Sequence, residues 1–140
     1  MKRFLTLLTL ALTLTACGAA ANTQEITISA SAMTYSPANL EIKAGQPVRL
    51  TFRNNDGVTH DFSVMEFPTT GAGVSVTEEP IADSHDAEMA VDPELHVAAA
   101  MNKSGTLEFT ASEPGTYEFF CTVPGHKEAG MVGTLTVLAP

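Results

Sequence analysis

The sequence predicts an all-β fold, an antiparallel Greek-key β-sandwich that carries one long acidic insert. Three observations predict it. Short runs of residues alternate apolar and polar side chains with a period of two, which is typical of half-buried strands. Turn signals rich in Gly and Pro separate these runs, and no long helical period interrupts them. Once a leader is removed, the chain of 140 residues still suffices for one domain with one core.

The predicted strands follow the order of the alternating runs. Isoleucines alternate with threonine at the start of the domain, and Leu, Ile, Val or Phe alternate with charged and polar residues in the runs that follow. The runs lie at residues 26–28, 40–42, 48–52, 60–65, 107–109, 117–119 and 131–137. Between them we expect turns at residues 35–37, 44–47, 54–57 and 113–115, because Gly permits and Pro presets the backbone angles of tight turns.

A segment at about residues 68–103 breaks the alternation and forms the predicted insert. Prolines and glycines interrupt it, and residues 78–94 contain seven acids and no base. A connection of this length inside a compact domain is typical of a binding loop or a lid. It contains two histidines. We expect His85 to be a solvated loop residue and His96 to be an exposed position on a short strand.

Three potential metal ligands recur at intervals of five residues directly after the run at 116–120. They are Cys121, His126 and Met131. Pro124 and Gly125 predict a turn that lets the loop double back toward one point. Soft sulfur ligands with imidazole suit copper, and a site of two His, one Cys and a long axial Met is the blue-copper electron-transfer arrangement.

The loop contains one His, so the second imidazole has to come from elsewhere, and His60 after the predicted turn at 54–57 is the natural candidate. Each residue alone has a simpler interpretation. Cys121 could be a buried small apolar residue, His60 a solvated or capping residue, and Met131 part of the core. Their joint occurrence in this order, with a Pro-Gly turn before His126, favours the copper interpretation.

On these residues the chain resembles the cupredoxins, the plastocyanin/azurin family of small copper proteins, over roughly residues 24–138. The resemblance implies one copper ion per chain, cycling between Cu(I) and Cu(II). It also implies that His60 is the isolated imidazole ligand, Cys121 the thiolate, His126 the second imidazole and Met131 the axial thioether. The spacing of the loop ligands is similar to that of auracyanin- and rusticyanin-like members.

One departure from the family pattern lies next to the first His. Many members have Asn or Ser at that position, where it braces the site near the thiolate, whereas this chain has Asp61. Groups that hydrogen-bond the ligands tune a metal centre. The departure therefore bears on how the surroundings of the ligands are built and, with them, on the reduction potential.

The first residues predict export. Residues 1–16 have a basic start and a short apolar run, which together are typical of a signal peptide and too short for a spanning helix. Residues 14–17 resemble a bacterial lipobox, so we expect Cys17 to be lipidated, residues 17–23 to form a tether and residues 24–140 to form the domain. The alternative is an ordinary signal peptide cut after Ala21, which would discard Cys17. Either cut leaves Cys121 as the only thiol, because Cys17 is lipidated or removed. Metal ligation would explain why an exported protein has an unpaired Cys.

The charge of the mature chain excludes some partners. The leader holds two of the seven basic residues and none of the sixteen acidic ones, so five bases and sixteen acids leave a net charge of −11. This charge argues against nucleic acid and against attraction to anionic lipid. It favours encounter with a basic patch on a partner, although a high net charge also occurs simply for solubility.

We therefore expect a monomeric, non-enzymatic one-electron carrier. It would be anchored by lipid to a membrane, facing the periplasm or exterior, and would serve redox partners such as cytochromes or membrane oxidoreductases. The alternative is a copper chaperone or copper buffer of the cell envelope, supported by the insert with His85, Met89, His96 and Met101 as possible secondary donors. An enzyme is disfavoured, because no His-x-His pair and no second Cys in the loop are present for a further copper centre.

Overall fold

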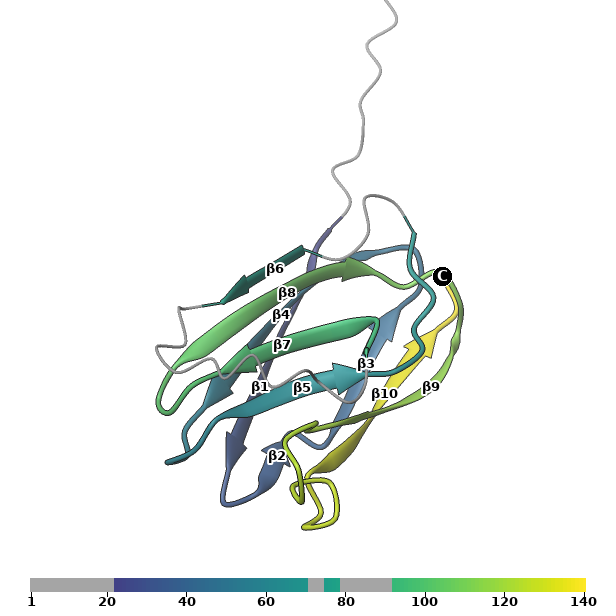
Figure 1. Ribbon diagram of the computed structural model, residues 1–140. Helices are drawn as coiled ribbons and strands as arrows, with labels where there is room; N and C mark the ends of the chain where they lie inside the picture. The colour runs from purple at the N-terminus through teal and green to yellow at the C-terminus, as the bar shows by residue number, and fades with distance from the viewer. Residues whose placement is uncertain (1–21, 71–74, 79–91) are drawn as a thin grey trace, which may run out of the picture.

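Two β-sheets pack face to face in the computed structural model, which describes residues 22–70, 75–78 and 92–140 (Figure 1). No helix occurs in these ranges, so none of the described residues belongs to a helix that could span a membrane. The ten strands are β1 (Gln24–Ser31), β2 (Thr34–Ser36), β3 (Asn39–Lys43), β4 (Pro47–Asn54), β5 (His60–Val64), β6 (Ser75–Glu78), β7 (Leu95–Ala99), β8 (Ser104–Thr110), β9 (Gly115–Phe120) and β10 (Val132–Leu138).

The strand order is β2-β1-β4-β8-β6 in the first sheet and β3-β10-β9-β5-β7 in the second. This arrangement confirms the predicted all-β sandwich. The pairing is mixed, however, because β1 and β4 run parallel, as do β3 and β10, while the other paired strands are antiparallel. The chain leaves the first sheet after β2, forms β3 in the second sheet and then returns as β4. That excursion lets β4 run in the same direction as β1.

The core lies between the sheets and follows the period-two pattern of the sequence. On β4, Val48, Leu50 and Phe52 are buried, while Arg49 and Arg53, which alternate with them, are exposed. Burying an apolar side chain of this size contributes about 1.5–3 kcal/mol. Aromatic rings continue the core toward the candidate site, as shown by the ring centroids of Phe62 and Phe119 at 4.8 Å and of Tyr35 and Phe119 at 5.1 Å.

Two local expectations are wrong. The predicted turn at residues 35–37 begins inside an edge strand, β2, whose Tyr35 is buried in the core and pairs with Ala30 of β1. His96 does lie on a short strand, β7, but it is half-buried rather than exposed. The local sequence reveals neither the main-chain pairing of β2 with β1 nor the packing of β7 beside β5, where His96 lies opposite the buried Ser63.

The described parts of the predicted insert at about 68–103 include two strands. β6 pairs with β8 in the first sheet, and β7 pairs with β5 in the second. Leu95 and Val97 of β7 are fully buried in the core. His85 and Met89 belong to residues 79–91, which lie outside the described residues.

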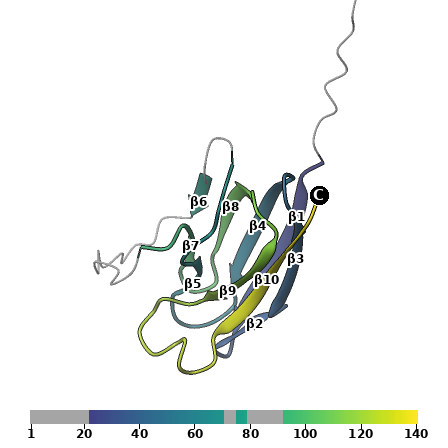
Figure 2. The same ribbon diagram turned by 90° about the vertical axis from the view of Figure 1, so that its right-hand side faces the viewer.

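The candidate ligands lie at one end of the sandwich. β9 ends immediately before Cys121, β10 begins immediately after Met131, and β5 begins at His60. The connection between β9 and β10 extends beyond the lower end of the sheets in both views (Figures 1 and 2). The second sheet therefore holds the start of the loop, its end and the isolated His in a common framework.

Candidate metal centre

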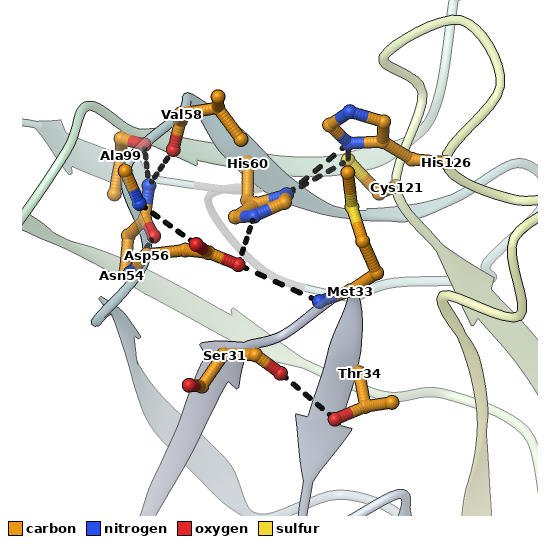
Figure 3. A network of polar contacts seen from close by, with 11 residues as sticks. Ser31, Met33, Thr34, Asn54, Asp56, Val58, His60, Ala99, Cys121 and His126 are labelled. Atoms are coloured by element: carbon orange, nitrogen blue, oxygen red, sulfur yellow. Dashed lines mark hydrogen bonds and ion pairs between the residues drawn. The ribbon is translucent and has the colours of Figure 1, made fainter.

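Side chains of His60, Cys121 and His126 converge on one point (Figure 3). The Nδ1 atoms of the two imidazoles are 3.2 Å apart. The Sγ atom of Cys121 lies 3.3 Å from Nδ1 of His126 and 3.9 Å from Nδ1 of His60. No other group of three or more His, Cys, Asp or Glu donors occurs within the ranges that the structure describes.

These separations fit a shared metal ion. Nitrogen and sulfur ligands lie about 2.0–2.3 Å from a bound transition metal. Two such ligands at a roughly trigonal angle are about 3.5 Å apart, and the three distances between the donor atoms lie around this value. A thiolate with two imidazoles is a donor set that suits copper. Both the positions and the chemical types of the three donors therefore fit a copper ion.

The site is buried with one ligand near its surface. His60 and Met131 are fully buried and Cys121 is 1% exposed, whereas His126 is 9% exposed. Val58, Pro124 and Gly125 are exposed around this end of the molecule. A ligand at the edge of an otherwise closed site offers a short route between the metal and a partner, while the interior excludes water.

Main-chain hydrogen bonds set the shape of the ligand loop. The peptide N–H of His126 donates to the carbonyl of Val123 at 3.1 Å, which closes a turn over Pro124 and Gly125. Gly125 has φ +84°, the value that a type II turn requires at its third position and that Gly adopts without strain. The predicted Pro-Gly turn is therefore confirmed.

The same loop is closed across its two ends. The N–H of Met131 donates to the carbonyl of His126 at 3.0 Å, and the N–H of Cys121 donates to the carbonyl of Met131 at 3.2 Å. Lys127 bonds Glu118 of β9 at 2.5 Å and lies 3.9 Å over the ring of Phe120. All three candidate ligands in the loop are thus joined to one another or to β9.

Asp56 lies on the outer side of His60 (Figure 3). Its Oδ2 is 3.3 Å from Nε2 of His60, so the ring can donate outward while Nδ1 faces Cys121 and His126. The N–H of Gly57 donates to Oδ1 of Asp56 at 2.8 Å, and the N–H of Asp56 donates to Oδ1 of Asn54 at 2.9 Å. Sequence reasoning identified this stretch as a turn but missed the role of Asp56.

Asn54 anchors this turn to the sheets. Its Nδ2 donates to the carbonyls of Val58 at 2.6 Å and Ala99 at 2.8 Å, and its side chain is buried. The bond to Ala99 joins the turn to the end of β7. An amide that accepts from one side of the turn and donates to the other fixes the approach of the chain to His60.

Asp61 forms the bridge between β5 and the ligand loop. Its carboxylate accepts from the N–H of Thr122 at 2.9 Å and 3.1 Å, from the Thr122 hydroxyl at 2.8 Å and from the Ser63 hydroxyl at 2.7 Å. Its Oδ2 is also 3.7 Å from Sγ of Cys121. The hydroxyl of Tyr35 donates to the Asp61 carbonyl at 2.5 Å. Asp61 is itself buried.

Burial and neighbouring charge shift the proton affinities around the site. Burial, followed by the charge of Asp61, raises the pKa of the Cys121 thiol to about 11. Burial, followed by the nearby His60, lowers the pKa of His126. The pKa of Tyr35 is raised, first by burial and then by Cys121 and Asp61. Hydrogen bonds from Gly57 and His60 lower the pKa of Asp56.

Of the remaining candidate residues, the two that the structure describes, His96 and Met101, do not belong to the metal-binding group. His96 pairs across the strands with Ser63 and belongs to no metal-binding group among the described residues. Met101 is an exposed side chain between β7 and β8. Cys17, His85 and Met89 lie outside the described residues.

Fold and donor set together define a small copper-binding β-sandwich protein. Residues 22–138 match the family of copper binding proteins of the plastocyanin/azurin type, and the chain belongs to this family. It is 34% identical over 123 residues to auracyanin-B of Chloroflexus aurantiacus, covering 84% of this chain and 52% of that protein. It is 36% identical over 107 residues to plastocyanin of Solanum tuberosum, covering 75% of this chain and 88% of that protein.

Two further comparisons agree with this assignment. The chain is 30% identical over 110 residues to the copper-resistant cuproprotein CopI of Rubrivivax gelatinosus, covering 79% of this chain and 63% of that protein. A solved structure of auracyanin B matches with a TM-score of 0.62 and 29% identity, covering 82% of this chain and 88% of that one. The chain spans about half the length of auracyanin-B and less than two thirds of CopI.

The predicted resemblance to the cupredoxins is therefore confirmed, including the likeness to auracyanin. Copper is the metal of this family, and His60, Cys121 and His126, with Met131 buried beside them at the end of the loop, are arranged as a blue copper site.

Proposed function

We propose that the protein is a type 1 (blue) mononuclear copper protein that carries one electron at a time between exported or membrane-associated redox partners. The observation that carries this proposal is the convergence of one thiolate and two imidazole Nδ1 atoms on a buried point at the end of the sandwich. His60, Cys121 and His126 are the strong ligands in this proposal, and Met131 is the weak axial one. Copper supplies the reversible change between Cu(I) and Cu(II).

The chain's own contribution is a framework that does not need to move during that change. His60 begins a strand that is buried along its whole length, and Cys121 directly follows a strand of the same sheet. Asp61 joins these two segments through Thr122, and the hydrogen bonds of Met131 close the loop. Because these hydrogen bonds hold the ligand segments in place independently of the metal, we expect little rearrangement during electron transfer.

Electron exchange in this proposal takes place through the edge of His126. This imidazole is the most exposed of the ligands, and Val58, which is 47% exposed, adds apolar surface at the same end of the molecule. Pro124 and Gly125 are exposed in the turn before His126. A small apolar surface of this kind supports brief docking to a redox partner rather than a permanent complex.

The cellular setting is part of the proposal. Residues 1–16 act as an export signal, lipid on Cys17 anchors the mature protein to a membrane, residues 17–23 form the tether and residues 24–140 form the domain. The partners are redox proteins such as cytochromes or membrane oxidoreductases, and the protein acts as a monomer without an enzymatic activity of its own. Its strongly acidic composition supports a partner with a basic surface near its redox centre.

A visible spectrum of the Cu(II)-loaded mature protein tests the proposed function. A thiolate bonded to Cu(II) gives an intense visible absorption band, and we expect this band to disappear on reduction and to return on oxidation with copper still bound. Rapid loss of copper on reduction would contradict the carrier. So would Cu(II) binding without an intense band.

Copper handling remains the second candidate function, favoured by the likeness to a copper-resistant cuproprotein. A chaperone or buffer has to release its metal, whereas a carrier retains it through many cycles. Mixing the Cu(I) form with a limiting amount of chelator distinguishes the two. The carrier keeps its copper while a handler transfers it within the time of the experiment.

A further inference from the structure

Two carboxylates lie next to the strong copper ligands, one beside Cys121 and the other beside His60. Asp61 is on the thiolate side, with Oδ2 at 3.7 Å from Sγ of Cys121. Asp56 is on the imidazole side, with Oδ2 at 3.3 Å from Nε2 of His60. Neither position is explained by copper ligation, because neither carboxylate belongs to the converging group of donors.

The surroundings of Asp61 favour its negative charge. The peptide N–H and hydroxyl of Thr122 and the hydroxyl of Ser63 all donate to its two oxygens, at 2.7–3.1 Å. An ionised carboxylate has acceptor sites for all of these donors. Asp61 is 3% exposed, so water screens its field only weakly.

Asp56 acts through the ring of His60. A carboxylate that accepts from the outer nitrogen of a metal-binding imidazole fixes the tautomer and makes the inner nitrogen a stronger donor. Hydrogen bonds from Gly57 and, at 3.5 Å, from the N–H of Met33 hold this carboxylate in place. The His60 ring is fully buried, and its Nε2 faces Asp56 while its Nδ1 faces Cys121 and His126.

Cu(II) carries one more positive charge than Cu(I), so nearby negative charge and stronger donation both stabilise Cu(II) more than Cu(I). We propose that Asp61 and Asp56 act as positioning residues that set the copper centre to a low reduction potential. The inference rests on the proposed function, because it assumes that the bound copper changes oxidation state. A centre with a low reduction potential readily gives up its electron. The chain would therefore act as an electron donor to partners that are readily reduced.

The test compares neutral variants with a control of the same charge change. The variants are Asp61→Asn, Asp56→Asn and the double variant, and the control is Glu41→Gln. Glu41 is exposed on β3 opposite Thr136, away from the start of β10 where the ligand loop ends. Cu(I) and Cu(II) affinities are measured separately by competition with chelators, and the potential is measured by redox titration of the visible band.

We expect Asp61→Asn to raise the ratio of Cu(I) to Cu(II) affinity at least tenfold, which corresponds to 59 mV for a one-electron couple. Asp56→Asn raises the ratio in the same direction, the double variant raises it further, and Glu41→Gln changes it less than about twofold. The loss should be in Cu(II) affinity, since a merely structural role would weaken both oxidation states together. If Asp61→Asn does not fold, Asp61→Ser removes the same charge with a smaller side chain.

Different results would contradict the proposed function and the role of the two carboxylates. A wild type without an intense Cu(II) band would contradict the proposed function. A wild type with the band, whose Asp61 and Asp56 variants keep the potential of the Glu41→Gln control or lose both affinities equally, would leave the carrier intact and overturn the role of the carboxylates.

Discussion

Thr122 donates both its peptide N–H and its hydroxyl to the carboxylate of Asp61, at 2.9 Å and 2.8 Å. The two residues stand 61 positions apart, yet each follows directly on a copper ligand, His60 and Cys121. Their contact therefore fixes the distance between the ligand that opens β5 and the ligand that follows β9.

This contact predicts a stability effect of the threonine hydroxyl. Thr122→Val removes one hydrogen bond to a charged group, which is worth about 1.5–3 kcal/mol, and should lower the free energy of unfolding of the apoprotein by about that amount. Denaturant unfolding measures it. Thr116→Val is the matched control, because Thr116 is exposed on β9. Equal stability of the two variants would mean that the hydroxyl contributes nothing.

Replacing the proposed thiolate ligand, Cys121, should remove the visible colour of the copper protein. Cys121→Ser replaces the sulfur by a hydroxyl that cannot give the thiolate-to-copper transition, so the intense visible band should vanish even if the two imidazoles still bind some copper. Absorption spectroscopy of the Cu(II)-loaded variant checks this. Survival of the same band would show that the assignment of Cys121 is wrong.

Replacing the proposed axial ligand, Met131, should change the reduction potential of the copper centre. Met131 is fully buried, and Met131→Leu keeps nearly the same volume, so the fold should lose less than about 1.5 kcal/mol. Removal of the weak thioether donor disfavours Cu(II), so copper and colour should remain while the reduction potential rises. Redox titration measures the change. An unchanged potential would place Met131 outside the coordination sphere.

Burial of the thiol predicts proton release. Because the pKa of Cys121 is raised to about 11, the thiol of the apoprotein is protonated at pH 8, and copper binding has to displace that proton. We expect about one proton released from the thiol per copper, and an apparent affinity that rises as the pH rises toward 11. Calorimetry with Cu(I) in buffers of different ionisation enthalpy counts the protons. Cys121→Ser should release about one fewer.

The number of copper ions separates the carrier from the copper handler. His96 lies on β7 outside the metal-binding group of the described residues, and a solvated loop donor, as expected of His85, has to lose conformational entropy before it coordinates, so both should be dispensable. We expect one tightly bound copper per chain in native mass spectrometry, and an unchanged visible spectrum in His85→Ala/His96→Ala. Two tight ions in the wild type, falling to one in the double variant, would favour the copper handler.

The alternating runs and the loop from Cys121 to Met131 could be interpreted correctly without coordinates, because both are local patterns. A period of two marks one buried face of a strand whatever its partner, and Pro124 with Gly125 specifies a turn through its own backbone angles. The identity of the metal also followed from the kinds of donors in that loop. The parallel pairing of β1 with β4, the strand at residues 75–78 and the pairing of the short strand around His96 with β5 did not follow, because pairing depends on where distant segments meet.

The kinds of ligand, the turn that aims His126 and the charged residue after His60 can all be identified from the amino-acid sequence. What that charge does depends on how the strands pack. Asp61 reaches Thr122 and Cys121 because β5 and β9 are neighbours in one sheet, and Asp56 reaches His60 because Asn54 holds the preceding turn against Ala99. A side chain's effect on a metal depends on distance and burial, and both are created when segments far apart in the chain pack together.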